Sequence, residues 1–172
     1  MENNRKLSAS CVVIVDDKVL LVKHTYGAAK GKYLIPGGFS EDRELPQATA
    51  EREVLEETGV TVQANDLIAV RFTEQEVWCI FNATYIKGVP VSDNGENEDA
   101  VFMPIEEALV SDCVVETTRV ILKAVLDTSK KSLKKSDFVS LHCPLSDATY
   151  HLIGEKELEM MKETSFIINT AR

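Results

Sequence analysis

Residues 38–60 read GFSEDRELPQATAEREVLEETGV, and this stretch decides the fold because it contains the clearest helix signal of the chain. Pro46 suits the first turn of a helix, where its missing N–H group costs nothing. The residues that follow are rich in Ala, Glu and Leu, and Gly59 is a good C-terminal stop. The sequence therefore predicts a helix over residues 45–58.

Three glutamates share one face of this predicted helix. At about 100° per residue, Glu56 and Glu57 fall within one narrow arc beside Glu53. Three like charges repel one another, and no lysine lies on that arc to relieve them. The arrangement becomes favourable when a hard divalent cation sits over the face and carboxylate oxygens coordinate it. Arg52, four residues before Glu56, can brace that carboxylate.

The apolar residues of the helix form two stripes. Ala50 and Val54 make one stripe, and Ala48 and Leu55 make the other. We therefore expect the helix to be buried on more than one side, between a sheet and other structure. Such burial would hold the carboxylates rigidly, as metal chemistry requires.

The segments around the helix carry alternating strand and helix signals. A hairpin is expected around Asp16-Asp17-Lys18, because apolar and β-branched runs flank this turn. A short strand at residues 33–35 is stopped by Pro36-Gly37-Gly38. Further strands are predicted at 67–72, 77–86 and 100–103, and helices at 104–109 and 117–126. Mixed strands and helices of this kind form a layered α/β domain.

Composition and charge restrict the class of protein. The net charge is −9, and residues 1–128 hold 12 Lys and Arg against 22 Asp and Glu, which argues against nucleic-acid binding. The sequence shows no apolar stretch near the roughly 20 residues of a membrane span and no signal-peptide pattern. We expect a cytoplasmic protein that binds no membrane. The cysteines, which we expect to be buried reduced thiols, are Cys11, Cys79, Cys113 and Cys143.

The glutamate-rich stretch resembles the Nudix box, G-x5-E-x7-R-E-U-x-E-E-x-G-U, in which U is aliphatic. Every specified position is met, and the resemblance extends over roughly residues 6–127. It implies an α/β/α sandwich with a mixed sheet, which we expect to occupy residues 1–127. The matching positions are Gly38, Glu44, Arg52, Glu53, Val54, Glu56, Glu57, Gly59 and Val60.

The resemblance implies hydrolysis of a pyrophosphate bond in a nucleoside diphosphate linked to another moiety, with Mg²⁺ or Mn²⁺ as cofactor. A small nucleotide would be the substrate. Glu53, Glu56 and Glu57 would be the main metal ligands, and Glu44 an outer or water-mediated ligand. Arg52 would brace the carboxylates, while Gly38 and Gly59 would form the turns that frame the helix.

The general base is left open by the box. It could be Glu53, but family members often take the base, or a further metal ligand, from a downstream loop. Residues 92–99 are predicted to be such a loop, and Glu96, Glu98 and Asp99 lie in it. We favour Glu98, with a solvated acidic loop as the alternative reading.

Substrate-binding residues are harder to predict. Lys23 and Lys32, together with His24 and Lys30, could contact phosphate or could simply be solvated. His24 is read as structural rather than catalytic. Phe72, Trp78 and Phe81 could stack a base, although core packing is the favoured reading for Trp78 and Phe81. ADP-ribose hydrolases of the family that the box resembles usually have a proline shortly beyond the box, and the absence of proline between Val60 and Pro90 argues against that substrate.

The tail carries a second pattern. Residues 128–137 read as a linker, and residues 138–172 read as strand, helix and strand, at 138–142, 155–162 and 165–169. Doubly apolar strands in this order indicate a piece of parallel α/β sheet. The segments SDFVSLHCPL, HLIG and INTAR resemble the NAD-binding, Rossmann-like domain of D-isomer 2-hydroxyacid dehydrogenases. The resemblance would place Cys143 and Pro144 beside the cofactor and Arg172 on a substrate carboxylate.

This second resemblance is incomplete. The chain has no GxGxxG motif to cradle a pyrophosphate, and the family's acid/base histidine is missing. We therefore expect an inactive fragment that arose by gene fusion or truncation. It would be loosely ordered, or docked on the Nudix domain or on a second copy of the chain, which would make a homodimer. Two alternative functions stay open: a non-catalytic, nucleotide-binding Nudix-fold regulator and an NAD-dependent 2-hydroxyacid oxidoreductase.

Overall fold

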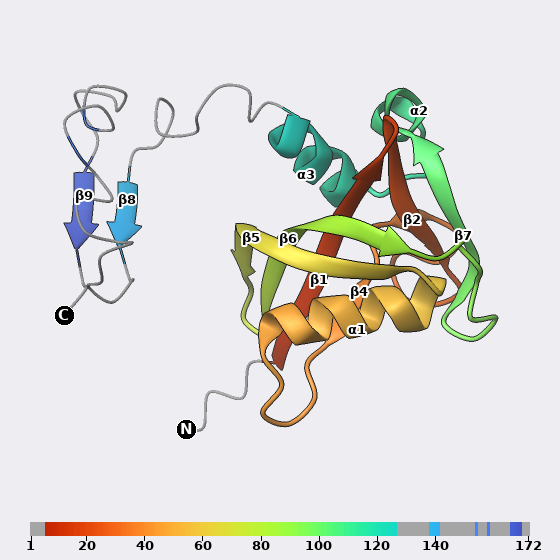
Figure 1. Cartoon of the computed structure of the whole chain (residues 1–172), viewed down its shortest axis with the longest axis horizontal. Helices are drawn as coiled ribbons and strands as arrows, with labels where there is room; N and C mark the ends of the chain where they lie inside the picture. The colour runs from red at the N-terminus through yellow and green to blue at the C-terminus, as the bar shows by residue number, and fades with distance from the viewer. Residues whose placement is uncertain (1–5, 127–137, 142–153, 155–157, 159–165, 170–172) are drawn as a thin grey trace. The chain divides into compact units, whose positions relative to one another are not determined.

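The computed structural model describes residues 6–126, 138–141, 154, 158 and 166–169 (Figure 1). The chain divides into two compact units, Met1–Val125 and Leu126–Arg172, and each is described by itself. The first unit alternates strands and helices. Its elements are β1 (Lys6–Val15), β2 (Lys18–His24), β3 (Tyr33–Leu34), β4 (Gly37–Phe39), α1 (Pro46–Thr58), β5 (Thr61–Phe72), β6 (Glu76–Lys87), β7 (Asn97–Pro104), α2 (Ile105–Val110) and α3 (Glu116–Leu126).

A mixed sheet of seven strands forms the centre of this unit. The strand order is β3-β2-β1-β6-β5, with β4 paired to β1 and β7 paired to β2. β1 runs parallel to β6, and its other pairings, with β2 and β4, are antiparallel. The β1–β2 turn has positive φ at Asp16 and Asp17, as a two-residue type I′ hairpin requires. The predicted hairpin and mixed sheet are thus confirmed.

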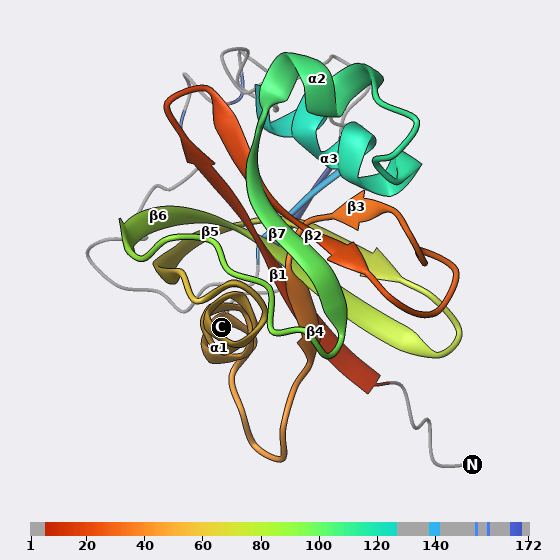
Figure 2. The same cartoon turned by 90° about the vertical axis from the view of Figure 1, so that its right-hand side faces the viewer.

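Helices cover both faces of the sheet (Figure 2). Because side chains alternate along a strand, neighbouring residues of β1 enter different cores. Val12 packs in a cluster with Leu122 of α3, whereas Val13 packs in a second cluster with Val54 of α1. The architecture is therefore an α/β/α sandwich, as the resemblance to the Nudix box implies.

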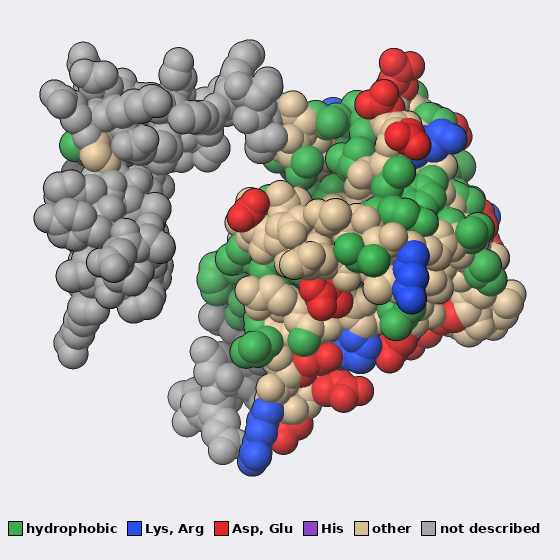
Figure 3. Space-filling view, in the orientation of Figure 1, with side chains coloured by type: hydrophobic (Ala, Val, Ile, Leu, Met, Phe, Trp, Pro, Cys, Tyr) green, Lys and Arg blue, Asp and Glu red, His purple; other side chains and the backbone are tan. Residues whose placement is uncertain are grey.

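Helix α1 begins and ends as its sequence indicates, but it is buried on one side only. Pro46 lies in its first turn, and Gly59 adopts a left-handed φ of 68° and donates its N–H to Leu55 O. Ala50 and Val54 are fully buried, whereas Ala48 is exposed and Leu55 is 48% exposed. The expectation of a second buried stripe is wrong, because the outer side of α1 faces solvent. Figure 3 shows acidic side chains over and beside this helix.

The sheet contains one strand that was not predicted, β4, and two strands that begin earlier than predicted, β5 and β7. Residues 37–39 form β4, although Pro36 and the two glycines read as a stop. β5 begins at Thr61, six residues before the predicted strand, because it pairs with β6 through a bulged register. β7 begins at Asn97, so Glu98 and Asp99 belong to a strand paired with β2 and not to the preceding loop.

The cysteines differ in exposure, which corrects part of the sequence prediction. Cys11 and Cys79 are buried, but Cys113 is exposed, and Cys143 lies outside the described residues. Burial, reinforced by the charge of Glu51, raises the pKa of Cys11 to about 12.

We expect iodoacetamide at pH 8 to alkylate Cys113 within minutes and to leave Cys11 unmodified in the folded protein, because the thiolate is the reactive form. Peptide mapping by mass spectrometry gives the extent of labelling at each position. Equal labelling of both residues in the native protein would contradict the burial of Cys11.

The second unit contains one pair of described strands, β8 (Phe138–Leu141) and β9 (Phe166–Asn169). They pair in parallel, from Phe138 opposite Phe166 to Leu141 opposite Asn169, which confirms the predicted parallel strands. Of the predicted helix at 155–162 the structure describes only Leu158, which is helical and donates its N–H to Gly154 O. The linker at 128–137, Cys143, Pro144 and Arg172 lie outside the described residues. Within the described parts, no helix is long and apolar enough to cross a membrane.

Deletion of residues 130–172 is expected to leave the thermal midpoint of the first unit within about 3 °C of the full chain, a change below about 1 kcal/mol. The reason is that both hydrophobic cores consist of residues before position 126. Differential scanning calorimetry of both chains makes the comparison. A larger fall would show that the tail stabilises the first unit.

Candidate active site

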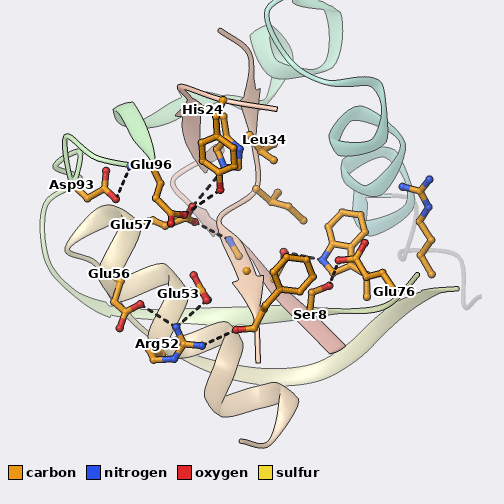
Figure 4. Close-up of a pocket in the computed structure, with 18 residues that line it drawn as sticks. Ser8, His24, Leu34, Arg52, Glu53, Glu56, Glu57, Glu76, Asp93 and Glu96 are labelled. Atoms are coloured by element: carbon orange, nitrogen blue, oxygen red, sulfur yellow. Dashed lines mark hydrogen bonds and ion pairs between the residues drawn. The ribbon is translucent and has the colours of Figure 1, made fainter. Parts of the chain in front are cut away.

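A cleft of about 660 Å³ lies beside α1 and the first strands of the sheet (Figure 4). One wall is formed by α1. The rim on that side comes from the end of β2 and from residues before β7, and the opposite end is formed by β1, β4, β5 and β6. The lining side chains include Arg52, Glu53, Glu56 and Glu57 on the wall; His24, Tyr26, Asp93 and Glu96 at the rim; and Ser8, Ser10, Phe39, Arg71, Glu76 and Trp78 at the opposite end.

Arg52 is the centre of the carboxylate wall. Its Nη1 donates to Glu53 Oε1 at 2.8 Å and to Glu56 Oε2 at 3.0 Å. Its Nε and Nη2 donate to the two oxygens of Glu44 at 2.9 and 2.8 Å, and Nη2 also donates to Phe39 O. The predicted contact between Arg52 and Glu56 is therefore present, and the same guanidinium also holds two further carboxylates.

Glu44 is held near the start of α1. Besides Arg52, it accepts a hydrogen bond from the backbone N–H of Glu41 at 3.0 Å and one from Thr49 Oγ1 at 2.8 Å. The hydrogen bonds from Arg52, together with these two, lower the pKa of Glu44 to about 2 against an opposing effect of burial. Glu44 is thus an ionised anchor that fixes Arg52 under the wall.

Glu53 lies against the backbone of β4. A Cβ atom at Gly38 would come within 2.5 Å of the Glu53 carboxyl carbon, so glycine is needed for this approach. Burial raises the pKa of Glu53, and the hydrogen bond and charge of Arg52 oppose the rise, while Glu57 and Glu56 add to it. Because this carboxylate is half-buried and lies beside like charges, a bound cation would stabilise its ionised form.

Glu57 is the most buried carboxylate of the wall, with 3% of the residue exposed. Its Oε2 accepts the backbone N–H of Gly37 at 2.8 Å, and its Oε1 lies 3.6 Å from His24 Nε2. Burial raises its pKa, and the contact with His24 and the hydrogen bond from Gly37 lower it. His24 stacks on the ring of Tyr26 with 5.1 Å between centroids, and Figure 4 shows His24 above Glu57. His24 therefore holds a carboxylate of the wall.

Several predicted residues lie elsewhere. Glu98 pairs with Lys23 at 2.7 Å, and neither residue lines the cleft. Lys32 does not line it either, nor does Phe72, which is 68% exposed. Glu98 lies where the pairing of β7 with β2 shifts register, between Asn97 and Asp99, and its exposed side chain forms the ion pair with Lys23.

Glu96 lines the cleft in place of Glu98. It precedes β7, and Tyr26 donates its hydroxyl to Glu96 Oε2 at 3.2 Å. Figure 4 shows Glu96 and Glu57 on the same side of the cleft. The sequence placed Glu96 in the right region but offered no signal to choose it over its neighbours.

Trp78 also lines the cleft, while it packs partly against the core. Sequence reasoning favoured the core for both Trp78 and Phe81, and only Phe81 is fully in the core, at 3% exposure. The missed signal was in β1, where Ser8 and Ser10 are polar residues on one face of an otherwise apolar strand. Trp78 lies on the strand beside them.

The donor set fits a hard divalent cation, since carboxylate oxygens are the ligands that Mg²⁺ and Mn²⁺ prefer. Glu53, Glu56 and Glu57 lie along one wall of the cleft. Among the described residues, no three His, Cys, Asp or Glu side chains come together closely enough to hold a metal ion. Arg52 holds Glu53 and Glu56 instead, and Gly37 and His24 hold Glu57.

Comparison with known families identifies the class of protein. The NUDIX domain model matches residues 4–125, which is most of the chain, so the chain belongs to the Nudix family of hydrolases. The NAD-binding domain model of D-isomer specific 2-hydroxyacid dehydrogenases matches residues 109–172. The two matches overlap in residues 109–125, which include most of α3.

Solved structures show the same fold as the first unit. A MutT Nudix hydrolase from Burkholderia pseudomallei has a TM-score of 0.62 and 20% identity over 70% of this chain and 98% of that one. A Nudix hydrolase from Clostridium perfringens has a TM-score of 0.62 and 24% identity over 72% of this chain and 97% of that one. An ADP-ribose pyrophosphatase from Streptococcus suis has a TM-score of 0.59 and 20% identity over 72% of this chain and 91% of that one.

The tail is similar to a short part of glyoxylate reductases. The enzyme of Thermococcus litoralis is 62% identical over 40 residues, which are 23% of this chain and 12% of that protein. The enzyme of Korarchaeum cryptofilum is 56% identical over 43 residues, 25% of this chain and 13% of that protein. The chain thus spans about an eighth of the length of these relatives, and the segment matches the predicted dehydrogenase-like fragment.

Proposed function

We propose that the chain hydrolyses a pyrophosphate bond in a nucleoside diphosphate linked to another moiety, with Mg²⁺ or Mn²⁺ as cofactor. The observation that carries the proposal is the wall of α1, where Glu53, Glu56 and Glu57 line one cleft and Arg52 holds the first two. The cleft volume of about 660 Å³ is in the range of small-molecule sites. Membership of the Nudix family supports the same chemistry.

Glu53, Glu56 and Glu57 would hold the cation, and Glu44 would act as an outer ligand or through Arg52. When bound, a divalent cation neutralises the pyrophosphate oxygens and lowers the pKa of water. The protein's own contribution is orientation. Arg52 keeps the carboxylates of Glu53 and Glu56 pointed along the wall, and the N–H of Gly37 fixes Glu57.

We propose Glu96 as the general base, in place of Glu98. Its carboxylate lines the cleft near Glu57, and the hydroxyl of Tyr26 holds one oxygen while the other has no hydrogen-bond partner among the described residues. Glu53 is the second candidate, because it lies on the wall itself. In this proposal Glu98 takes no part in the reaction and forms an ion pair with Lys23.

Glu96→Gln is expected to lower kcat by about a hundredfold, because the amide cannot accept the proton from water. Glu98→Gln is the matched control, two residues away and outside the cleft, and it should keep kcat within about twofold. Steady-state kinetics of the two variants give both numbers. If the larger loss falls on Glu98→Gln, the assignment of the base is reversed.

A substrate panel tests the proposed function as a whole. Deoxynucleoside triphosphates, ADP-ribose, NADH and dinucleoside polyphosphates are incubated with the full chain, in Mg²⁺ or in EDTA, and released phosphate and nucleoside monophosphate are measured. We expect turnover of at least one compound in Mg²⁺ and none in EDTA. Tight nucleotide binding without any turnover would instead favour a non-catalytic regulator.

A further inference from the structure

The end of the cleft opposite the carboxylate wall is a single row of side chains across four strands. Phe39 of β4 pairs with Ser8 of β1, Ser8 pairs with Trp78 of β6, and Trp78 pairs with Arg71 of β5. Paired residues on neighbouring strands share a face of the sheet. All four side chains therefore line the same surface, and all four border the cleft. In Figure 4, Ser8 lies on the far side of the cleft from Glu57 and Glu96.

Trp78 is fixed in this row as a platform. Its Nε1–H donates to Ser10 Oγ at 2.9 Å, and Ser10 is 3% exposed, so the polar edge of the indole is satisfied inside the protein. What the indole still presents to the cleft is its aromatic surface. Such a surface suits a flat aromatic group, which gains stacking energy without a competing hydrogen bond.

The same end of the cleft carries one cation and one anion that are not paired with each other. The guanidinium of Arg71, which borders the cleft, has no hydrogen-bond or ion-pair partner among the residues that the structure describes. Glu76 accepts a hydrogen bond from Ser8 Oγ at 2.5 Å and likewise has no cationic partner among the described residues. Arg52, the other arginine of the lining, is by contrast saturated by three carboxylates.

The backbone holds Glu76 in place. Glu76 N–H donates to Thr73 Oγ1 at 2.9 Å, and Thr73 N–H donates to Glu76 O, which closes the β5–β6 turn. Its side chain is oriented by the buried Ser8. A preorganised acceptor and an unpartnered guanidinium donor beside an aromatic platform complement a planar ligand with both donors and acceptors on its edge.

We propose that this end of the cleft binds the nucleobase of the substrate and that Glu76 and Arg71 select guanine. Guanine presents two adjacent donors, its N1–H and its amino group, to a carboxylate, and its O6 to a guanidinium. Adenine presents one donor beside the N1 lone pair, which a carboxylate repels. The inference rests on the proposed function, because the base belongs to the nucleotide whose pyrophosphate the carboxylate wall would cleave.

The protein supplies its own probe, because Trp78 is the only tryptophan of the 172 residues. Tryptophan fluorescence of the full chain is titrated with GMP, AMP and inorganic pyrophosphate. We expect GMP to quench the emission at about tenfold lower concentration than AMP, and pyrophosphate to leave it nearly unchanged. Quenching by pyrophosphate equal to that by GMP, or equal affinity for GMP and AMP, would overturn the proposal.

Two pairs of variants connect the effect to the named side chains. Glu76→Gln should weaken GMP binding about tenfold and remove the preference over AMP, whereas Glu74→Gln in the same turn should change neither. Arg71→Met should weaken GMP binding about tenfold, whereas Arg43→Met, at an exposed site outside the cleft, should not. If Glu76→Gln still preferred GMP over AMP as the wild type does, or if Arg71→Met bound GMP with wild-type affinity, the assignment of these two side chains to the base would be overturned.

The outcome separates this inference from the proposed function. Selective GMP quenching without hydrolysis of any substrate would refute the proposed hydrolysis and leave the base site standing. Mg²⁺-dependent hydrolysis with equal rates for guanine and adenine substrates would refute the base site and leave the hydrolase standing.

Discussion

Glu53→Gln is expected to lower kcat by about a thousandfold while the fold stays intact. The substitution keeps the shape of the side chain and the hydrogen bond from Arg52 Nη1 at 2.8 Å. It removes the negative charge from the carboxylate that lies against Gly38, inside the cleft. A cation would lose a ligand there, and Glu53 could no longer take a proton. Steady-state kinetics in saturating Mg²⁺ measure the loss.

Glu51→Gln is the matched control for this variant. Glu51 lies two residues earlier on α1, outside the cleft, and accepts the backbone N–H of Ala64 at 2.8 Å, which a glutamine oxygen can also accept. Its kcat should stay within about twofold of wild type, as expected for a surface substitution. A Glu53→Gln enzyme with a near-normal kcat would remove Glu53 from the reaction, both as ligand and as base.

Gly37→Ala is expected to lower the free energy of unfolding by about 3 kcal/mol. A Cβ atom at this position would lie 2.7 Å from Ser10 Cα, on the strand with which Gly37 is paired. Backbone atoms of two paired strands cannot yield without breaking the β1–β4 register. The N–H of Gly37 also binds Glu57, so the distortion would reach the carboxylate wall. Urea denaturation followed by circular dichroism measures the change.

Gly27→Ala is the control for Gly37→Ala, because it adds a side chain at a position with positive φ but no neighbouring atoms. Gly27 has a positive φ of 67°, but a Cβ atom there would meet nothing within 4 Å. The Gly27→Ala substitution should therefore lower the free energy of unfolding by only about 1 kcal/mol, the usual cost of a side chain on a residue with left-handed φ. Equal losses at the two positions would mean that Gly37 is not sterically constrained by β1.

The helix and the box could be predicted because their signals are local. Proline in the first turn, Gly59 at the end and glutamates three and four residues apart each act within one element. The contact between Arg52 and Glu56 followed from helix geometry alone. The contacts of Arg52 with Glu44 and with Phe39 O depend on where the preceding loop folds back, which no periodicity encodes.

The missed features depend on pairing between distant strands. Residues 61–66 include Gln63, Asn65 and Asp66, so they show no alternation of apolar and polar residues. They nevertheless belong to β5, because this segment pairs with β6. The choice between Glu96 and Glu98 turns on the point at which β7 begins, which is set by pairing with β2. Trp78 looked like a core residue because its neighbours in sequence are apolar. Its place at the cleft comes from strands β1 and β5 on either side.

Binding of Mn²⁺ to the full chain, followed by electron paramagnetic resonance of the free ion, tests the central claim most directly. The claim is that the carboxylates of α1 hold the divalent cation of a hydrolase. We predict saturable binding to the wild-type protein and affinity at least about tenfold weaker in Glu56→Gln and Glu57→Gln, with Glu51→Gln unchanged. Identical Mn²⁺ binding by all of these proteins would contradict the claim.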